Sequence, residues 1–313
     1  MKPLLRILKA GLQTTVQDLG RPQGASWGLP VGGAADGFAL QLANLMLGNP
    51  LDAAVLEITL GGFQAQFEQT SSFALAGANC QATLDGQLLL PNAVYRGVKG
   101  QVLRFMPPEQ GVRSYLALPG GIDVPLLWGS RSTLLASKIG GFAGRALKKG
   151  DVLSALRRDK SRSPCAVAMP ERGELIRFLP GPQWLQLGAE GQKLLTSQAW
   201  QVDIHSNRMG LKINASKLFM DIPMEMSSHA VMAGTIQLPP NGQPIILLSD
   251  AQVTGGYPVV GQVIQADLWR LGQLRAGESI HLFAVSEDNA LDALARQQAW
   301  FKRVASALAA HSL

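Results

Sequence analysis

The sequence has no apolar run that approaches the roughly 18 residues of a membrane-spanning helix, and only two cysteines occur among its 313 residues. Arg6 and Lys9 interrupt the N-terminal segment, which leaves no room for the apolar core of a signal peptide. Cys80 and Cys165 lie far apart and no CxxC occurs, so a disulfide framework is not expected. We therefore expect a cytoplasmic protein with no membrane partner.

Several ligand-binding signatures are also missing. The four histidines are scattered along the chain: His205, His229, His281 and His311. None lies at metal-ligand spacing from a cysteine, so no metal site is predicted. No GxxxxGK[ST] phosphate loop occurs. Of the net charge of +6, most arises between residues 145 and 172, where eight Lys and Arg outnumber three Asp and Glu without interleaved aromatic residues. No nucleic-acid interface is predicted.

Glycine and proline are abundant instead, with 34 and 18 residues. So many turn formers favour a mostly β architecture, and the length suffices for two domains with separate cores. The basic stretch at residues 157–170 is the expected boundary. We predict an N-terminal domain at residues 1–160 and a C-terminal domain at residues 171–313.

Two helices stand out from the β pattern. The first is predicted to begin at the N-cap Asp36 and to end at Gly48, with Asn44 on a side expected to be exposed. The second is a C-terminal helix capped by Ser286, whose apolar face is expected to comprise Leu291, Leu294, Phe301, Val304 and Leu308.

The β segments carry two local features. Turns at Gly100, Gly150 and Gly277 are each predicted to launch a strand. Glu57 lies inside the apolar strand Val55–Leu60, and a buried carboxylate requires a partner. A salt bridge within the fold is favoured over a catalytic role for Glu57.

The densest polar pattern lies at residues 225–258. Strands at Thr235–Leu238, which contains Gln237, and at Pro244–Leu248 are predicted to form a hairpin through Pro-Pro-Asn-Gly. Polar side chains then surround a glycine pair whose backbone N–H groups can approach a ligand: Asp250, Gln252, Thr254, Tyr257, Gly255 and Gly256. The alternative is a loop whose polar groups satisfy its own turns.

Two further polar clusters have two interpretations each. Asp18 and Arg21, next to Gln17, either bind each other and shape the turn or face a carboxylate or amide substrate. Arg208, which follows Asn207, suits a bidentate grip on carboxylate or phosphate. It can equally pair with an aspartate inside its own domain.

Five motifs, in order along the chain, resemble the biotin-dependent carboxyltransferase / allophanate-hydrolase subunit 2 family. The resemblance runs from about Leu4 to about Phe283. One departure is Val253, where the family pattern has threonine, which removes one hydroxyl at that position. The motifs are residues 14–21, 56–61, 120–125, 206–210, and 242–245 together with 254–258.

The resemblance implies a mostly β fold of two cyclophilin-like β-barrel domains facing each other across a cleft, with a few short helices and a C-terminal helix. It implies one subunit, termed C, of an ATP-dependent 5-oxoprolinase complex that converts 5-oxoproline to L-glutamate. The B subunit would be the direct partner that activates the lactam, and the A subunit would open the ring. ATP would be used by the complex. Biotin is not expected on this chain, since no Met-Lys-Met occurs.

The resemblance also implies roles for the polar residues. Arg208 would grip a substrate carboxylate or phosphate, and His229 is a candidate acid–base that could instead be a structural hydrogen-bonding residue. Backbone N–H groups at Gly255 and Gly256 would receive developing negative charge. The remaining residues would orient substrate or nucleotide or line the opposite wall: Asp250, Thr254, Tyr257, Asn207, Gln237, Gln17, Asp18 and Arg21.

Two other functions remain open within this resemblance. Some relatives are carboxyltransferases that act on a urea-type amide, with biotin carried by another protein. Others are non-catalytic antagonists of a histidine-kinase inhibitor. A stoichiometric complex without turnover would indicate the antagonist.

Overall fold

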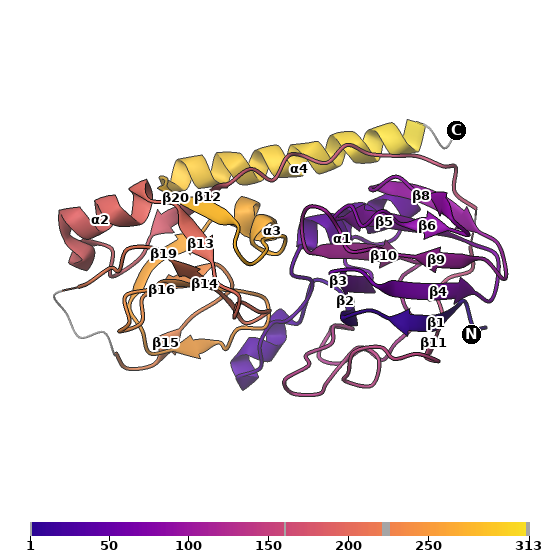
Figure 1. Ribbon diagram of the computed structural model, residues 1–313, viewed down its shortest axis with the longest axis horizontal. Helices are drawn as coiled ribbons and strands as arrows, with labels where there is room; N and C mark the ends of the chain where they lie inside the picture. The colour runs from indigo at the N-terminus through magenta and orange to yellow at the C-terminus, as the bar shows by residue number, and fades with distance from the viewer. Residues whose placement is uncertain (1, 160, 221–225, 311–313) are drawn as a thin grey trace. The chain divides into compact units, whose positions relative to one another are not determined.

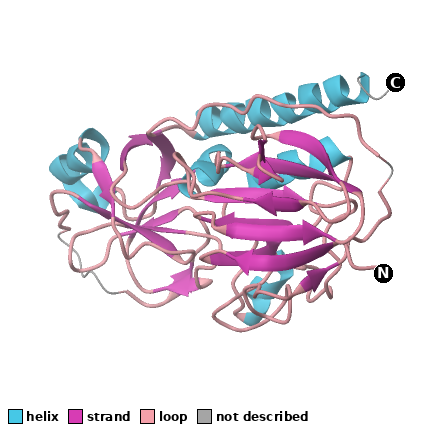
Figure 2. Cartoon of the chain, turned by 45° about the vertical axis from the view of Figure 1, so that its right-hand side comes forward, coloured by secondary structure: helices cyan, strands magenta, loops and turns pink. Residues whose placement is uncertain are grey.

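The computed structural model describes residues 2–159, 161–220 and 226–310. Most of its regular structure is β, as Figure 2 shows, which confirms the predicted class. The chain divides into two compact units, each discontinuous in sequence. Glu225 and His311 lie outside the described residues. Unit 1 comprises Met1–Arg21, Gly32–Pro170 and Trp300–Leu313, and unit 2 comprises Pro22–Val31 and Glu171–Ala299.

Unit 1 is built on two sheets (Figure 1). A six-stranded sheet has the order β11-β1-β4-β9-β6-β7, and a five-stranded sheet has the order β2-β3-β10-β5-β8. The strands of the first sheet are β11 (Val152–Leu153), β1 (Leu5–Ala10), β4 (Phe63–Phe67), β9 (Val102–Arg104), β6 (Thr83–Leu84) and β7 (Gln87–Leu88). Those of the second are β2 (Gln13–Gln17), β3 (Val55–Thr59), β10 (Arg113–Ala117), β5 (Ser71–Gly77) and β8 (Ala93–Gly97).

The core of unit 1 follows from the alternation of apolar residues along these strands. In β4, Phe63, Ala65 and Phe67 are buried while the two glutamines between them are partly exposed, because successive side chains point to opposite faces of a sheet. Phe63 packs edge to face on Phe105, with ring centroids 5.5 Å apart.

Helix α1 (Gly37–Leu47) packs in unit 1, and its predicted caps are confirmed. The Asp36 carboxylate accepts a hydrogen bond from the Ala39 N–H at 2.8 Å, and Gly48 has the left-handed conformation. The predicted exposure of Asn44 was wrong, since its side chain is fully buried. Its amide donates to the Ala53 carbonyl at 2.7 Å, so a neighbouring loop supplies the partner that a buried amide needs.

Unit 2 contains a closed barrel in the order β12-β19-β16-β17-β14-β13-β20. The predicted hairpin is confirmed, because β16 and β17 pair antiparallel and Gly242 in the turn has a φ of 74°. A separate two-stranded ribbon is formed by β15 (His229–Ala230) and β18 (Thr254–Gly255). The barrel strands are β12 (Leu175–Pro180), β19 (Val259–Val263), β16 (Thr235–Gln237), β17 (Ile245–Leu247), β14 (Gly210–Asn214), β13 (Trp200–Val202) and β20 (Ser279–Ala284).

Three predicted glycine turns precede strands as expected. Gly100, Gly150 and Gly277 have φ values of 93°, 91° and 86°, and they lead into β9, β11 and β20. This backbone conformation is unfavourable for residues with a Cβ, which explains the repeated glycine.

The predicted C-terminal helix is α4 (Glu287–Ala310), and the Ser286 hydroxyl accepts from the Asn289 N–H at 3.3 Å. Phe301, Val304 and Leu308 pack beside α1 within unit 1. Leu291 was wrongly placed on the packed face, because its side chain is 64% exposed. The shorter helices are η1 (Pro22–Trp27), η2 (Leu185–Leu187), α2 (Gly188–Ser197), η3 (Gln265–Asp267) and α3 (Leu268–Leu271). Within the described ranges, no helix combines the length and apolarity needed to cross a membrane.

Candidate functional site

The loop that follows β17 brings several predicted site residues of unit 2 together. The Asp250 N–H donates to the Arg208 carbonyl at 3.0 Å, and the Leu248 N–H donates to the Met209 carbonyl at 3.0 Å. Further along, the Val231 N–H donates to the Val253 carbonyl at 3.0 Å and extends the ribbon β15–β18. Backbone hydrogen bonds therefore hold the 206–210 turn and the ribbon to one loop.

Arg208 and Asp250 form a two-point ion pair in this loop. Nε lies 2.8 Å from Oδ2 and Nη2 lies 2.8 Å from Oδ1, with both side chains buried. Nη2 also donates to the Ser249 hydroxyl at 3.2 Å. Pairing with an aspartate of the same domain, one of the two interpretations of Arg208, is thus present. Asn207 shapes the turn, because its side-chain oxygen accepts from the Met209 N–H at 2.8 Å.

His229 lies in the ribbon with one ring nitrogen engaged. Nδ1 is 3.2 Å from the Ser227 carbonyl oxygen. A carbonyl only accepts, so Nδ1 carries a proton in this contact, and in the neutral imidazole Nε2 then has the lone pair. Nε2 is buried and has no hydrogen-bond partner among the described residues.

Gln237 occupies the space that the missing side chain of Gly255 leaves. A Cβ added to Gly255 would lie 2.5 Å from Nε2 of Gln237, closer than such atoms approach. Gln237 is 2% exposed, and its buried Nε2 has no partner among the described residues. Gly255 is therefore required for steric reasons. The sequence pattern, a glycine pair in a polar loop, did not predict this role.

The remaining predicted residues of this loop lie nearer the surface. Thr254 is exposed and Tyr257 is 37% exposed. The Gly256 carbonyl accepts from the Met226 N–H at 2.7 Å. The backbone carbonyl of Gly256 thus takes part in a hydrogen bond within the fold.

A cavity of about 900 Å³ lies within unit 2. Its wall is mainly apolar, and of the predicted site residues it includes His229. Sequence reasoning did not select the other polar residues of the wall, although Gln262 interrupts the apolar strand Val259–Val263 and could have been noticed. The lining includes Leu179, Val231, Met232, Val259, Gln262 and Glu287.

Gln17, Asp18 and Arg21 lie in unit 1 and are all buried. The Asp18 carboxylate accepts from the Ser130 hydroxyl at 2.7 Å and from the Gly20 N–H at 2.8 Å. Gln17 donates to the Thr133 carbonyl at 3.1 Å, and Arg21 donates to the Ser132 carbonyl. These side chains fasten the loop at residues 130–133 to the end of β2.

Glu57 has the internal partners that its burial requires. Its carboxylate accepts from the Tyr115 hydroxyl at 2.8 Å and from the Ala35 N–H at 2.8 Å, and it forms a salt bridge with Arg113 at 3.4 Å. Burial, and then the nearby carboxylates of Glu57 and Asp36, raise the pKa of Tyr115 well above its usual value. The predicted salt bridge inside the fold is confirmed.

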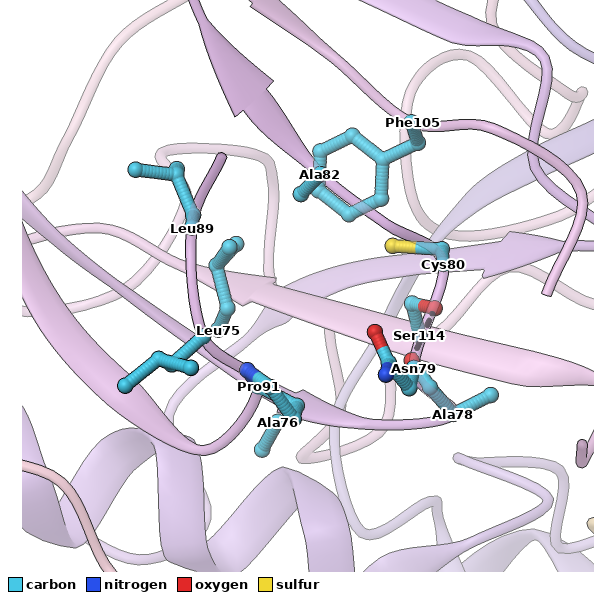
Figure 3. Close-up of a pocket in the computed structure, with 11 residues that line it drawn as sticks. Leu75, Ala76, Ala78, Asn79, Cys80, Ala82, Leu89, Pro91, Phe105 and Ser114 are labelled. Carbon is cyan, nitrogen blue, oxygen red and sulfur yellow. Dashed lines mark hydrogen bonds between the residues drawn. The ribbon is translucent and has the colours of Figure 1, made fainter. Parts of the chain in front are cut away.

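Cys80 lies at a small cavity of about 10 Å³ in unit 1 (Figure 3). Figure 3 shows its thiol among Phe105, Ser114 and aliphatic side chains. Burial raises the pKa of the Cys80 thiol, which disfavours the reactive thiolate. In the part of the chain that the structure describes, no three His, Cys, Asp or Glu side chains group as a metal site.

The sequence matches the carboxyltransferase domain, subdomain A and B, over residues 27–284. The chain belongs to this family. It is 42% identical to the C subunit of 5-oxoprolinase from Escherichia coli over 96% of this chain and 98% of that protein. It is 37% identical to the C subunit of 5-oxoprolinase from Haemophilus influenzae over 90% of this chain and 92% of that protein.

A solved structure shares the fold of this carboxyltransferase-family chain. The urea amidolyase of K. lactis superposes with a TM-score of 0.88 at 27% identity over 97% of this chain. The chain spans 20% of that protein. The architecture is thus that of one part of a much larger enzyme.

Proposed function

We propose that this chain is the C subunit of an ATP-dependent 5-oxoprolinase complex in the cytoplasm, converting 5-oxoproline to L-glutamate. The observation that supports this function is 42% identity to the E. coli protein of that name, covering 98% of its length. We further propose that the B subunit is the direct partner and that the A subunit opens the ring.

The proposed chemistry explains why the reaction needs ATP. A lactam carbonyl is a poor electrophile, and phosphorylation of its oxygen makes the ring susceptible to opening. The protein then acts by positioning and charge stabilisation. In this proposal Asp250 holds the Arg208 guanidinium toward a substrate carboxylate or phosphate. Thr254 and Tyr257 orient the ring, and N–H groups at Gly255 and Gly256 receive negative charge.

The cavity in unit 2 does not fit the triphosphate of ATP. Among the described residues that line it, Glu287 is the one that carries a charge, and a carboxylate repels phosphate groups. We therefore assign no ATP contact to this cavity and propose that the nucleotide is held elsewhere in the complex. Biotin is not proposed as an attached group of this chain.

Reconstitution tests this function. The chain is combined with candidate A and B subunits, ATP and 5-oxoproline, and glutamate and ADP are measured together. Coupled formation of both products that requires all three proteins is the expected result. If the chain and the B subunit form a stable complex and 5-oxoproline is still not turned over, the proposed substrate is rejected.

A carboxyltransferase acting on a urea-type amide is the second candidate. It is favoured by the TM-score of 0.88 to a urea amidolyase. Urea with a carboxybiotin donor on a separate carrier protein is the matched assay. If neither assay shows turnover while the complex with the B subunit modulates histidine-kinase signalling, the chain acts as a non-catalytic antagonist.

A further inference from the structure

Three buried nitrogen atoms of unit 2 lack hydrogen-bond partners among the described residues. Nε of Arg270 lies 3.4 Å from the carboxylate of Asp267, and the other two are Nε2 of His229 and Nε2 of Gln237. Burying a polar atom without a partner is unfavourable, and most folded proteins avoid it. His229 belongs to the ribbon β15–β18, and Gln237 reaches the ribbon from β16 at Gly255, so a common explanation is sought.

The strand register and the close approach of Gln237 to Gly255 bring both groups to one face of the ribbon β15–β18. His229 is directly opposite Gly255, and residues directly opposite in an antiparallel pair project to the same side. The side chain that Gly255 lacks would project there too, and Gln237 Nε2 lies 2.5 Å from its Cβ position. The imidazole and the carboxamide are therefore neighbours across the ribbon.

The two groups are chemically complementary. In the neutral imidazole whose Nδ1 donates to the Ser227 carbonyl, Nε2 is an acceptor. The carboxamide nitrogen of Gln237 donates. Together they present one acceptor and one donor. A ligand that satisfies them must offer a donor and an acceptor side by side.

A cyclic amide has this arrangement. In a lactam the ring forces the N–H and the C=O onto the same edge, whereas an ordinary trans peptide bond points them in opposite directions. We propose that His229 and Gln237 bind the N–H and C=O edge of a lactam, His229 Nε2 accepting from the N–H and Gln237 donating to the carbonyl. This assignment rests on the proposed function and names the atoms that recognise its substrate class.

The adjacent cavity suits the rest of a lactam ring. His229 lies in its wall, and so does Val259, the ladder partner of Gln237. Leu179, Val231 and Met232 supply apolar surface for ring methylenes. Both nitrogens are buried in this state, so a lactam reaches them only if the ribbon moves away from Gln237.

Urea shares the same edge chemistry but has no methylenes. The apolar wall therefore favours a lactam over urea. Because the carboxylate of Glu287 is the one charged group among the described lining residues, the neutral lactam 2-pyrrolidinone is the right probe for the chain itself. N-methyl-2-pyrrolidinone, which has the same ring without the N–H, is the matched control ligand.

Binding is measured by NMR on the full-length chain, alone and in complex with the B subunit, with ¹⁵N-labelled histidine rings. We expect 2-pyrrolidinone to shift Nε2 of His229, and N-methyl-2-pyrrolidinone and urea to bind at least tenfold more weakly. His229→Ala and Gln237→Leu should each weaken 2-pyrrolidinone binding at least tenfold. His205→Ala, a change at an exposed histidine of the same unit, should leave binding unchanged.

Several results would overturn the lactam site. One is that N-methyl-2-pyrrolidinone binds as tightly as 2-pyrrolidinone, and another is that urea binds more tightly. The others are that His229→Ala binds 2-pyrrolidinone with unchanged affinity, or that the Nε2 signal of His229 shifts in neither the chain nor the complex. His229→Gln guards against misfolding, because it keeps a hydrogen-bonding side chain of similar reach and should retain part of the affinity.

Turnover separates this inference from the proposed function. If the reconstituted complex converts 5-oxoproline equally well with His229→Ala, the 5-oxoprolinase function stands and the lactam site falls. If 2-pyrrolidinone binds as expected but no lactam is opened, the site stands and the function falls.

Discussion

The guanidinium of Arg208 and the carboxylate of Asp250 meet edge to edge inside unit 2, with two nitrogen–oxygen distances of 2.8 Å. The two residues are 42 positions apart in sequence, so the pair joins two loops that are distant along the chain. Bidentate geometry and burial make this contact stronger and more directional than a surface ion pair.

Removing one partner of this pair should be costly. Asp250→Asn removes the charged carboxylate from its two-point contact with a buried guanidinium, and we expect a loss of about 3–5 kcal/mol in the free energy of unfolding. Denaturant titration measures it. In a double-mutant cycle, Arg208→Met with Asp250→Asn should cost clearly less than the sum of the single changes. Glu68→Gln, which breaks the exposed pair with Arg6, should cost about 1 kcal/mol or less, and strict additivity at 208 and 250 would contradict the coupling.

The Tyr115 hydroxyl is expected to stabilise unit 1 through two hydrogen bonds. It donates to Glu57 and accepts from the Asp36 N–H, each at 2.8 Å. Tyr115→Phe removes both hydrogen bonds from a buried site, so we expect a loss of about 1–3 kcal/mol in stability. Tyr95→Phe is the control, since its hydroxyl contacts backbone atoms of Leu90 at an exposed position. Equal losses in thermal or denaturant unfolding would show that burial of the network is irrelevant.

Gly255 is expected to be required because Gln237 fills its side-chain space. Gly255→Ala forces the amide to move and should lower stability by about 1–3 kcal/mol. Shortening the obstructing side chain relieves the clash, so Gln237→Ala should be less harmful with Gly255→Ala than alone. Gly277→Ala keeps open space around the new Cβ and tests backbone strain alone. Additive losses at 237 and 255 would reject the steric explanation.

Asp151 is expected to make part of the stability depend on pH. Hydrogen bonds from Arg145, together with the Lys148 N–H and the Arg145 charge, lower the pKa of Asp151 below its usual value despite partial burial. A depressed folded-state pKa stabilises the fold above the unfolded-state pKa, and this stabilisation is lost as the pH falls through the folded value.

Asp151→Asn should therefore lower Tm at pH 7, and the difference from the unchanged protein should shrink below about pH 4. Thermal unfolding across this range measures it. Asp52→Asn, at an exposed loop position, is the control. A constant difference between about pH 7 and pH 3 would mean that the carboxylate charge plays no part.

Local signals in the sequence were sufficient for several elements. Asp36 and Gly48 delimit α1, and Ser286 begins α4. The hairpin of β16 and β17 follows from its turn residues. These features depend on neighbouring residues only, because caps and tight turns are satisfied within a few positions of the chain.

Other predictions failed or stayed open because they depend on distant residues. Asn44 was expected at the surface, but loop carbonyls reach its amide and make burial favourable. The helical spacing of apolar residues in α4 predicted a packed Leu291, but no other described part of the fold covers this side chain, which is exposed. Arg208 had two equal interpretations until the position of Asp250 was known.

The sequence by itself determined the β-rich class, the main turns and caps, and the family, since each is encoded in short ordered patterns. Tertiary structure alone decided which polar residues meet. It paired Arg208 with Asp250, enclosed Asp18 with Ser130, and set Gln237 against Gly255. The physical reason is that burial and hydrogen-bond partners arise from contacts across tens of residues, which the spacing of residues along a chain does not specify.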